Sequence, residues 1–138
     1  MCIRDRCLMT LTKADFIWKA AYDLVGNVSG ALFISGDLTY ENIVWNKEIY
    51  TGTIPTKAEV ETKAQALLDG EAMRRLREHR DNLLKETDWV VTKANETGVA
   101  ETTAWKTYRQ QLRDLPSSAT PEIDGMFIKN VTWPTKPS

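Results

Sequence analysis

The chain has 138 residues, of which 42% are hydrophobic and 27% are charged, as is usual for one globular domain or for a small domain with extended appendages. Its 18 Lys and Arg residues and 19 Asp and Glu residues give a formal net charge of -1, which argues against a general nucleic-acid-binding protein, because such a protein needs a clustered basic face. No apolar run approaches the roughly 20 residues that a membrane-spanning helix requires, so no membrane partner is expected.

The first residues of the chain are expected to lie outside its fold. Residues 1–6, MCIRDR, match the translation of a transposon end sequence used to prepare sequencing libraries, and the true start is then either Met9 or missing from this sequence. Both cysteines, Cys2 and Cys7, lie in this short stretch. Because no further Cys and no His stands at metal-site spacing from them, they predict neither a metal site nor a structural disulfide.

The N-terminal part of the chain is expected to form one helix and a β-hairpin. A helix is predicted over residues 12–26, where Thr12 and Asp15 have the spacing of a capping box and apolar residues recur at helical spacing. Two short apolar runs, residues 31–34 and 43–45, favour β-strands. A hairpin is the expected pairing, although the connection between the two runs is longer than a tight turn.

The middle of the chain carries the strongest helical pattern. Thr56 and Glu59 have the spacing of a capping box, and good helix formers follow for roughly 30 residues. The apolar pattern shifts phase near Gly70, which predicts a bend or two helices in tandem at that point. A second helix is predicted over residues 100–114, and Pro116 is expected to end it, because the residue before a proline avoids the helical region.

These two helices are expected to form an antiparallel hairpin, because a loop of about a dozen residues would join them. Trp105, Tyr108 and Leu112 fall on one face of the second helix, and this face is predicted to pack on the long helix. Two prolines among the last five residues exclude a helix there and favour an extended tail.

The predicted fold class is therefore a helix-dominated α+β fold with an N-terminal helix, a small β-hairpin, an antiparallel helical hairpin and an extended C-terminal tail. The expected division of the chain is an artefactual or disordered stretch (1–8), the helix with the β-hairpin (9–54), the helical hairpin (55–116) and the tail (117–138).

No catalytic, cofactor-binding or metal-binding motif stands out in the sequence. His79 is the only histidine, and its neighbours at helical spacing include neither a nucleophile nor an orienting acid, so a packed or solvated histidine is expected. Asp81, Glu86 and Asp88 lack the alternating oxygen ligands and central glycine of a calcium loop. We therefore expect a non-enzymatic protein with no cofactor, no metal and no small-molecule substrate.

An arginine cluster in the long helix allows two interpretations. The arginines at positions 74, 75, 77 and 80 spread around most of the helix circumference and alternate with acidic residues. This pattern favours a solvated helix with ion pairs over a surface that binds nucleic acid. A nucleic-acid-binding regulator is the weaker alternative.

The tryptophans of the last third of the chain could be core anchors or partner-binding residues, because both roles favour large aromatic side chains. Trp105 and Tyr108 are expected in the core, and Trp89 is left open between the two roles. Trp133 stands next to Pro134 in the tail and is the best candidate to dock onto another surface, either a partner or its own helical hairpin.

Several motifs follow one another in a fixed order along this chain. They are IVW at residues 43–45, PTKAE at 55–59, an arginine-rich helix, LLKETDW at 83–89, WKTYRQQLRDLP at 105–116 and VTWPTKP at 131–137. This ordered set resembles the phage tail assembly chaperone family of tailed bacteriophages, including phages of marine bacteria. The resemblance extends from about Leu32 and is closest from Met73 onward, with Val90 and Val91 as a departure directly after Trp89.

The resemblance implies a small, non-enzymatic protein of the bacterial host cytoplasm that holds a phage tail protein until it polymerises. The implied partner is a tape-measure, tube or fibre component, with no nucleic acid, membrane or small-molecule partner. A minor virion structural or tail-fibre-associated protein is the alternative. The candidate partner-binding residues, all within these motifs, are Trp89, Arg109, Trp133 and Pro134.

Overall fold

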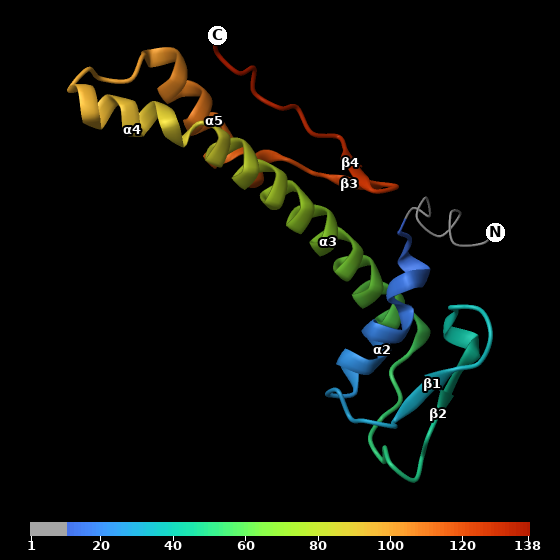
Figure 1. Cartoon of the computed structure of the whole chain (residues 1–138). Helices are drawn as coiled ribbons and strands as arrows, with labels where there is room; N and C mark the ends of the chain where they lie inside the picture. The colour runs from blue at the N-terminus through green and yellow to red at the C-terminus, as the bar shows by residue number, and fades with distance from the viewer. Residues whose placement is uncertain (1–10) are drawn as a thin grey trace, which may run out of the picture. The chain divides into compact units, whose positions relative to one another are not determined.

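The computed structural model describes residues 11–138, so the expectations for residues 1–8 and for a start at Met9 lie outside the described residues. The described chain folds into helices and two small antiparallel strand pairs, which confirms the helix-dominated α+β class (Figure 1). It divides into two compact units, one of residues up to Glu71 with Ile123–Met126 and one of Ala72–Glu122 with Phe127–Ser138.

The first helix begins as the capping pattern predicts. The Asp15 carboxylate accepts hydrogen bonds from the backbone N–H of Thr12 at 2.7 Å and from the Thr12 hydroxyl at 3.0 Å. The first turn is a 3-10 helix, η1 (Lys13–Phe16), which continues as α2 (Ile17–Leu24). The prediction of a helix here is confirmed, with its first turn wound more tightly than an α-helix.

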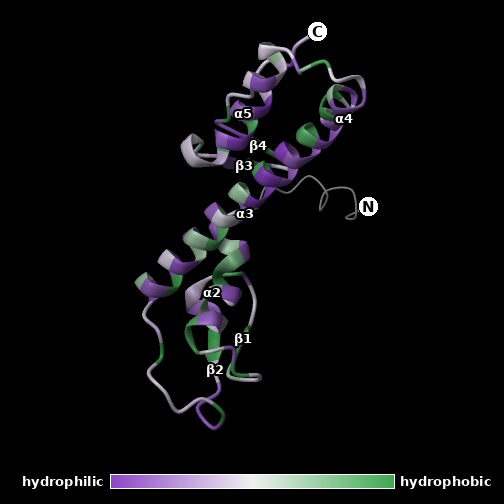
Figure 2. Ribbon diagram, turned by 90° about the vertical axis from the view of Figure 1, so that its left-hand side faces the viewer, coloured by the Kyte–Doolittle hydropathy of each residue, from purple (hydrophilic) through white to green (hydrophobic). Residues whose placement is uncertain are grey.

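The predicted β-hairpin is also confirmed. Strand β1 (Leu32–Ile34) pairs antiparallel with β2 (Ile43–Trp45), in a register that places Phe33 opposite Val44. A short 3-10 turn, η2 (Tyr40–Asn42), shapes the long connection between them. Figure 2 shows the hydrophobic residues of α2, β1 and β2 in green. The buried side chains of this unit form the first core, which consists of Ile17, Ala20, Ala21, Val25, Ala31, Leu32, Ile43, Val60 and Ala64.

The long helix α3 (Lys57–Glu86) starts at the predicted capping box. The Glu59 carboxylate accepts from the Thr56 backbone N–H at 2.7 Å, and this hydrogen bond lowers the pKa of Glu59. The helix runs without interruption through Gly70, so the expectation of two tandem helices at that residue is wrong. The phase shift has another cause, because Val60 and Ala64 pack into the first core, whereas Leu83 and Leu84 pack against a different cluster.

Replacing Gly70 with alanine is expected to raise the free energy of unfolding by about 0.5–1 kcal/mol, because alanine loses less backbone entropy in a helix interior. Gly70 is exposed, and a Cβ atom there would meet no atom within 4 Å. Thermal or urea unfolding measures the change. Gly98→Ala is the matched control: its φ of 67° is left-handed, so the same substitution should be destabilising there. A loss of stability in Gly70→Ala would contradict a continuous helix.

A further helix, α4 (Asp88–Thr97), replaces most of the loop that was expected between the two long helices. The break before it falls at Thr87, whose ψ of 5° departs from the helical value. Its C-terminal cap is Gly98, in the left-handed conformation that glycine adopts without strain. Apart from the buried Val90, α4 has little apolar periodicity, and therefore the sequence pattern did not reveal it.

The last helix, α5 (Thr103–Ser118), continues past Pro116, so the expected end at this proline is wrong. Because proline has no N–H, the helix lacks the hydrogen bond that residue 116 would otherwise donate to the Leu112 carbonyl oxygen, and it ends two residues after the proline. The Ser117 hydroxyl donates to the Asp114 carbonyl oxygen at 2.6 Å, and the Ala119 N–H donates to the Leu115 carbonyl oxygen at 3.0 Å. These bonds satisfy carbonyl groups that a helix end leaves free.

Two short strands follow α5 within the segment that was predicted to be a tail. Strands β3 (Glu122–Asp124) and β4 (Phe127–Lys129) form a two-stranded sheet. The turn between them places Gly125 at a φ of 61°, as expected for a turn at Asp124-Gly125. Beyond Asn130 the chain has neither helix nor strand, which agrees with the extended tail that its prolines predict.

Candidate partner-binding site

The second unit has its own hydrophobic core, built largely by one face of α5. This second core consists of Val90, Trp105, Tyr108 and Leu112, with Leu83, Leu84 and Trp133 packed against it. The prediction that the Trp105 face of α5 packs on the long helix is therefore confirmed, because Leu83 and Leu84 belong to α3. Burial, with a smaller contribution from the charge of Glu86, raises the pKa of Tyr108, so its phenol stays neutral.

A buried arginine joins α5 to the break between α3 and α4. The guanidinium of Arg109 donates through Nη1 to the Leu84 carbonyl oxygen at 3.0 Å and to Thr87 Oγ1 at 2.6 Å. Nη2 donates to Asp88 Oδ1 at 2.9 Å. Arg109 is only 7% exposed and Thr87 is fully buried. We name this set of four residues the arginine junction.

The arginine junction explains why the helix breaks where it does. A break at Thr87 leaves the last carbonyl groups of α3 without their helical partners, and such groups must be satisfied when they are buried. Arg109 satisfies one of them, and the Thr87 hydroxyl donates to the same Leu84 carbonyl oxygen at 2.9 Å. The planar guanidinium reaches several acceptors at once, which a lysine cannot do. Two sequence motifs about 20 residues apart thus meet in one contact.

Trp89 follows the junction directly and is presented at the surface. Its side chain is 54% exposed, and its ring meets the buried Trp105 ring edge-on, with 5.8 Å between the centroids. The two indoles line a cleft of about 180 Å³ between α4 and α5, which we call the Trp89 cleft. The other lining residues are Val90, Lys93, Ala94, Thr97, Val99, Ala100, Glu101 and Thr102. Trp89 is therefore an exposed aromatic group that rests on a buried one, rather than a core residue.

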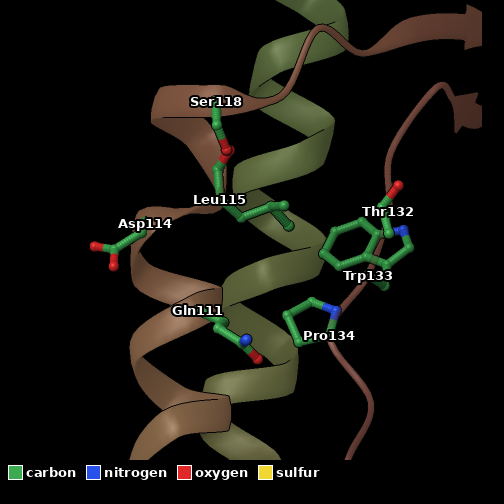
Figure 3. A pocket seen from close by; sticks show the side chains of 7 residues that line it. All are labelled: Gln111, Asp114, Leu115, Ser118, Thr132, Trp133 and Pro134. Atoms are coloured by element: carbon green, nitrogen blue, oxygen red, sulfur yellow. The ribbon is translucent and has the colours of Figure 1, made fainter.

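The tail places Trp133 and Pro134 against the helices of the same unit. The Trp133 ring meets the His79 ring of α3 edge-on, with 4.6 Å between the centroids, and it packs against the second core. A second cleft, of about 330 Å³, stays open between α5 and the tail, and we call it the tail groove (Figure 3). Its lining residues are Gln111, Asp114, Leu115, Ser118, Thr132, Trp133 and Pro134. In Figure 3 the side chains of Leu115 and Trp133 point toward one another.

The structure separates the roles of the four residues that the sequence singled out. Trp89 is exposed, Arg109 is buried in the arginine junction, and Trp133 with Pro134 lines the tail groove. No sequence pattern singled out Thr87, and the pattern around Asp88 suggested only a cation ligand, although both residues stand in the same motif as Trp89. The sequence feature that could have identified them is a threonine followed by an aspartate where a helix can end, together with an arginine on the apolar face of a later helix.

The remaining chemical candidates have structural partners. His79 lies against Trp133, as expected for a packed histidine. Arg74 pairs with Glu78 at 3.0 Å and Arg80 with Asp81 at 2.6 Å, which fits a solvated helix with ion pairs. Among residues 11–138, no cluster of three His, Cys, Asp or Glu side chains could hold a metal ion. No helix in this part of the chain is both long enough and apolar enough to cross a bilayer.

Fold and site together define a small helical protein that displays an exposed tryptophan beside a buried aromatic core. Comparison with known families gives a match to the phage tail assembly chaperone protein family over residues 73–138, just under half of the chain. This segment contains α4, α5, the arginine junction and the tail. The match confirms the resemblance to this family that the motifs of the segment predicted. No curated protein and no solved structure matches the chain.

Proposed function

We propose that the chain is a non-enzymatic chaperone that binds one phage tail protein transiently during virion morphogenesis, in the cytoplasm of the bacterial host. The family match supports a role in tail assembly. The partner would be a tape-measure, tube or fibre component that has not yet polymerised. The proposed binding surface lies in the second unit and comprises the Trp89 cleft and the tail groove.

The observation that carries this proposal is the exposure of Trp89 beside the buried Trp105. A tryptophan that is 54% exposed keeps a large apolar surface in water, and such residues are enriched among the strongest contributors to protein interfaces. Its neighbour Asp88 is fixed by Arg109, and its ring is fixed by Trp105. A preorganised aromatic anchor loses little conformational entropy when a partner covers it.

The interface would be small and partly polar, which suits a reversible complex. The Trp89 cleft of about 180 Å³ is lined by apolar side chains together with Lys93 and Glu101. A partner that inserts one apolar side chain there and pairs with these charges at the rim would bind specifically but would leave easily. A chaperone needs such a balance, because its client must be released to the growing tail.

Replacing Trp89 with alanine is expected to reduce capture of the tail protein at least about ten-fold, as loss of a central aromatic anchor does at other interfaces. The test co-expresses the chain with the tube, tape-measure and fibre proteins of a related phage, followed by affinity capture. Trp18→Ala is the matched control, because Trp18 is also exposed, at 41%, but belongs to the first unit. Equal capture by the wild-type chain and Trp89→Ala would contradict the proposed surface.

The same experiment addresses the alternative of a minor virion protein. A transiently bound chaperone should be recovered with the unassembled tail protein and should be absent from purified virions. Detection of the chain in virions at a fixed stoichiometry would contradict transient binding.

A further inference from the structure

The C-terminal tail is held on the second unit by few contacts. Trp133 provides the main one, through the edge-on contact with His79 and its packing on the second core. Farther along, Lys136 Nζ lies 3.7 Å from Glu86 Oε2. None of the backbone–backbone hydrogen bonds found outside helices and strands of the described chain involves residues 131–138.

These contacts make the tail easy to detach. The side chains of Lys136 and Glu86 are 50% and 59% exposed, and ion pairs at such exposure contribute little net stability. The attachment therefore depends on one tryptophan that is itself only half-buried. Pro134 and Pro137 keep the free tail extended, so little chain entropy is lost when it docks or redocks.

The docked tail shows which chemistry this surface accepts. An extended backbone lies along the helices, an indole meets an imidazole and apolar side chains, and a proline follows directly (Figure 3). Extended proline-containing segments commonly bind to aromatic-lined grooves in this manner. The tail does not fill its site, because about 330 Å³ stays open between α5 and residues 132–134.

We propose that this surface of α3 and α5 is a docking site for an extended partner segment that carries a tryptophan followed by a proline, and that residues 131–138 occupy it in the free protein. The chain's own tail is then an internal competitor that the partner displaces. The inference rests on the proposed function only for the partner being a tail protein. The groove and its occupant are defined by this chain alone.

The sole histidine of the chain provides a direct reporter of this site. His79 lies under the indole of Trp133, so the ring current of that indole shifts the imidazole NMR signals. The probe is a synthetic peptide of residues 131–138, VTWPTKPS, added to full-length protein. The two proteins compared are the wild type and Trp133→Ala, in which the indole is missing and the site is open.

The peptide is expected to bind Trp133→Ala and to move its His79 signals toward their wild-type positions. The same peptide with alanine in place of tryptophan should leave them unchanged. Half-saturation of the wild type should need about ten-fold more peptide if the tail is docked nine-tenths of the time, since apparent affinity falls with the fraction of open sites. Equal half-saturation of the two proteins, or no shift in Trp133→Ala, would overturn the proposal.

A second variant tests the same proposal in case Trp133→Ala does not fold. Lys136→Glu keeps the tryptophan but places a like charge beside Glu86, so the tail should detach more often and the peptide should bind more tightly than to the wild type. This titration is run at low ionic strength, where exposed like charges repel most, and an unchanged affinity in Lys136→Glu under that condition would contradict the internal competitor. Because no tail protein is present in these titrations, their failure is distinguishable from failure of the co-expression experiment.

Discussion

Replacing Trp105 with alanine is expected to lower the free energy of unfolding of the second unit by about 3–5 kcal/mol, as for other large buried aromatic side chains. Trp105 is 9% exposed and is the largest member of the second core. Its ring lies edge-on to both Trp89 and Tyr108, with centroid distances of 5.8 and 6.1 Å. Removing it leaves a cavity and two rings without their neighbour, and such a cavity closes only in part.

Calorimetric or urea unfolding of the full chain measures this loss. Lys106→Ala is the control, because Lys106 is the next residue on α5, is exposed and should change stability little. Trp105→Ala should also weaken partner capture, because Trp89 loses the ring that holds it. An unchanged melting temperature in Trp105→Ala would contradict the position of this residue in the core.

Replacing Arg109 with alanine is expected to lower the free energy of unfolding by about 2–4 kcal/mol, because hydrogen bonds from a buried charged donor are among the stronger ones in proteins. The substitution removes all the guanidinium bonds of the arginine junction and leaves a void at a residue that is 7% exposed. Arg109→Lys should recover only part of the loss, since an ammonium group cannot reach the same acceptors with the same geometry.

The control for Arg109 separates its buried contacts from its ion pair. The Asp88 side chain is 61% exposed, so Asp88→Asn should cost less than about 1 kcal/mol. A loss in Asp88→Asn as large as that in Arg109→Ala would show that the ion pair, rather than the bonds to Leu84 and Thr87, stabilises the junction. Circular dichroism and urea unfolding of the three variants decide between these outcomes.

The sequence identified the residues of the candidate site but did not predict where each of them lies. Trp89, Arg109, Trp133 and Pro134 stand in motifs whose order indicates the family, and the sequence could select them for that reason. The motifs did not indicate which of these side chains is exposed and which is buried. Arg109 bonds to residues 21 to 25 positions earlier, and no pattern of local spacing predicts contacts over such a separation.

Two errors in the expected helices have the same origin. Helix α4 has a weak apolar pattern and is short, and isolated helices of that length are marginal in water. It forms because Val90 enters the second core and because the arginine junction fixes its first residues. Likewise α5 continues past Pro116 while Leu112 and Leu115, in the two turns up to this proline, are both buried. In both segments tertiary packing outweighs local propensity.

By itself the sequence determined the features that depend on near neighbours. The two capping boxes, the strand pair, the buried face of α5 and the extended end of the chain all follow from spacings of a few residues, and the ordered motifs indicate the family. Only the tertiary structure decided that α4 forms, that Arg109 is buried while Trp89 is exposed, and that Trp133 docks beside His79. The physical reason is that burial of a side chain depends on which distant segment covers it, and local spacing carries no information about that.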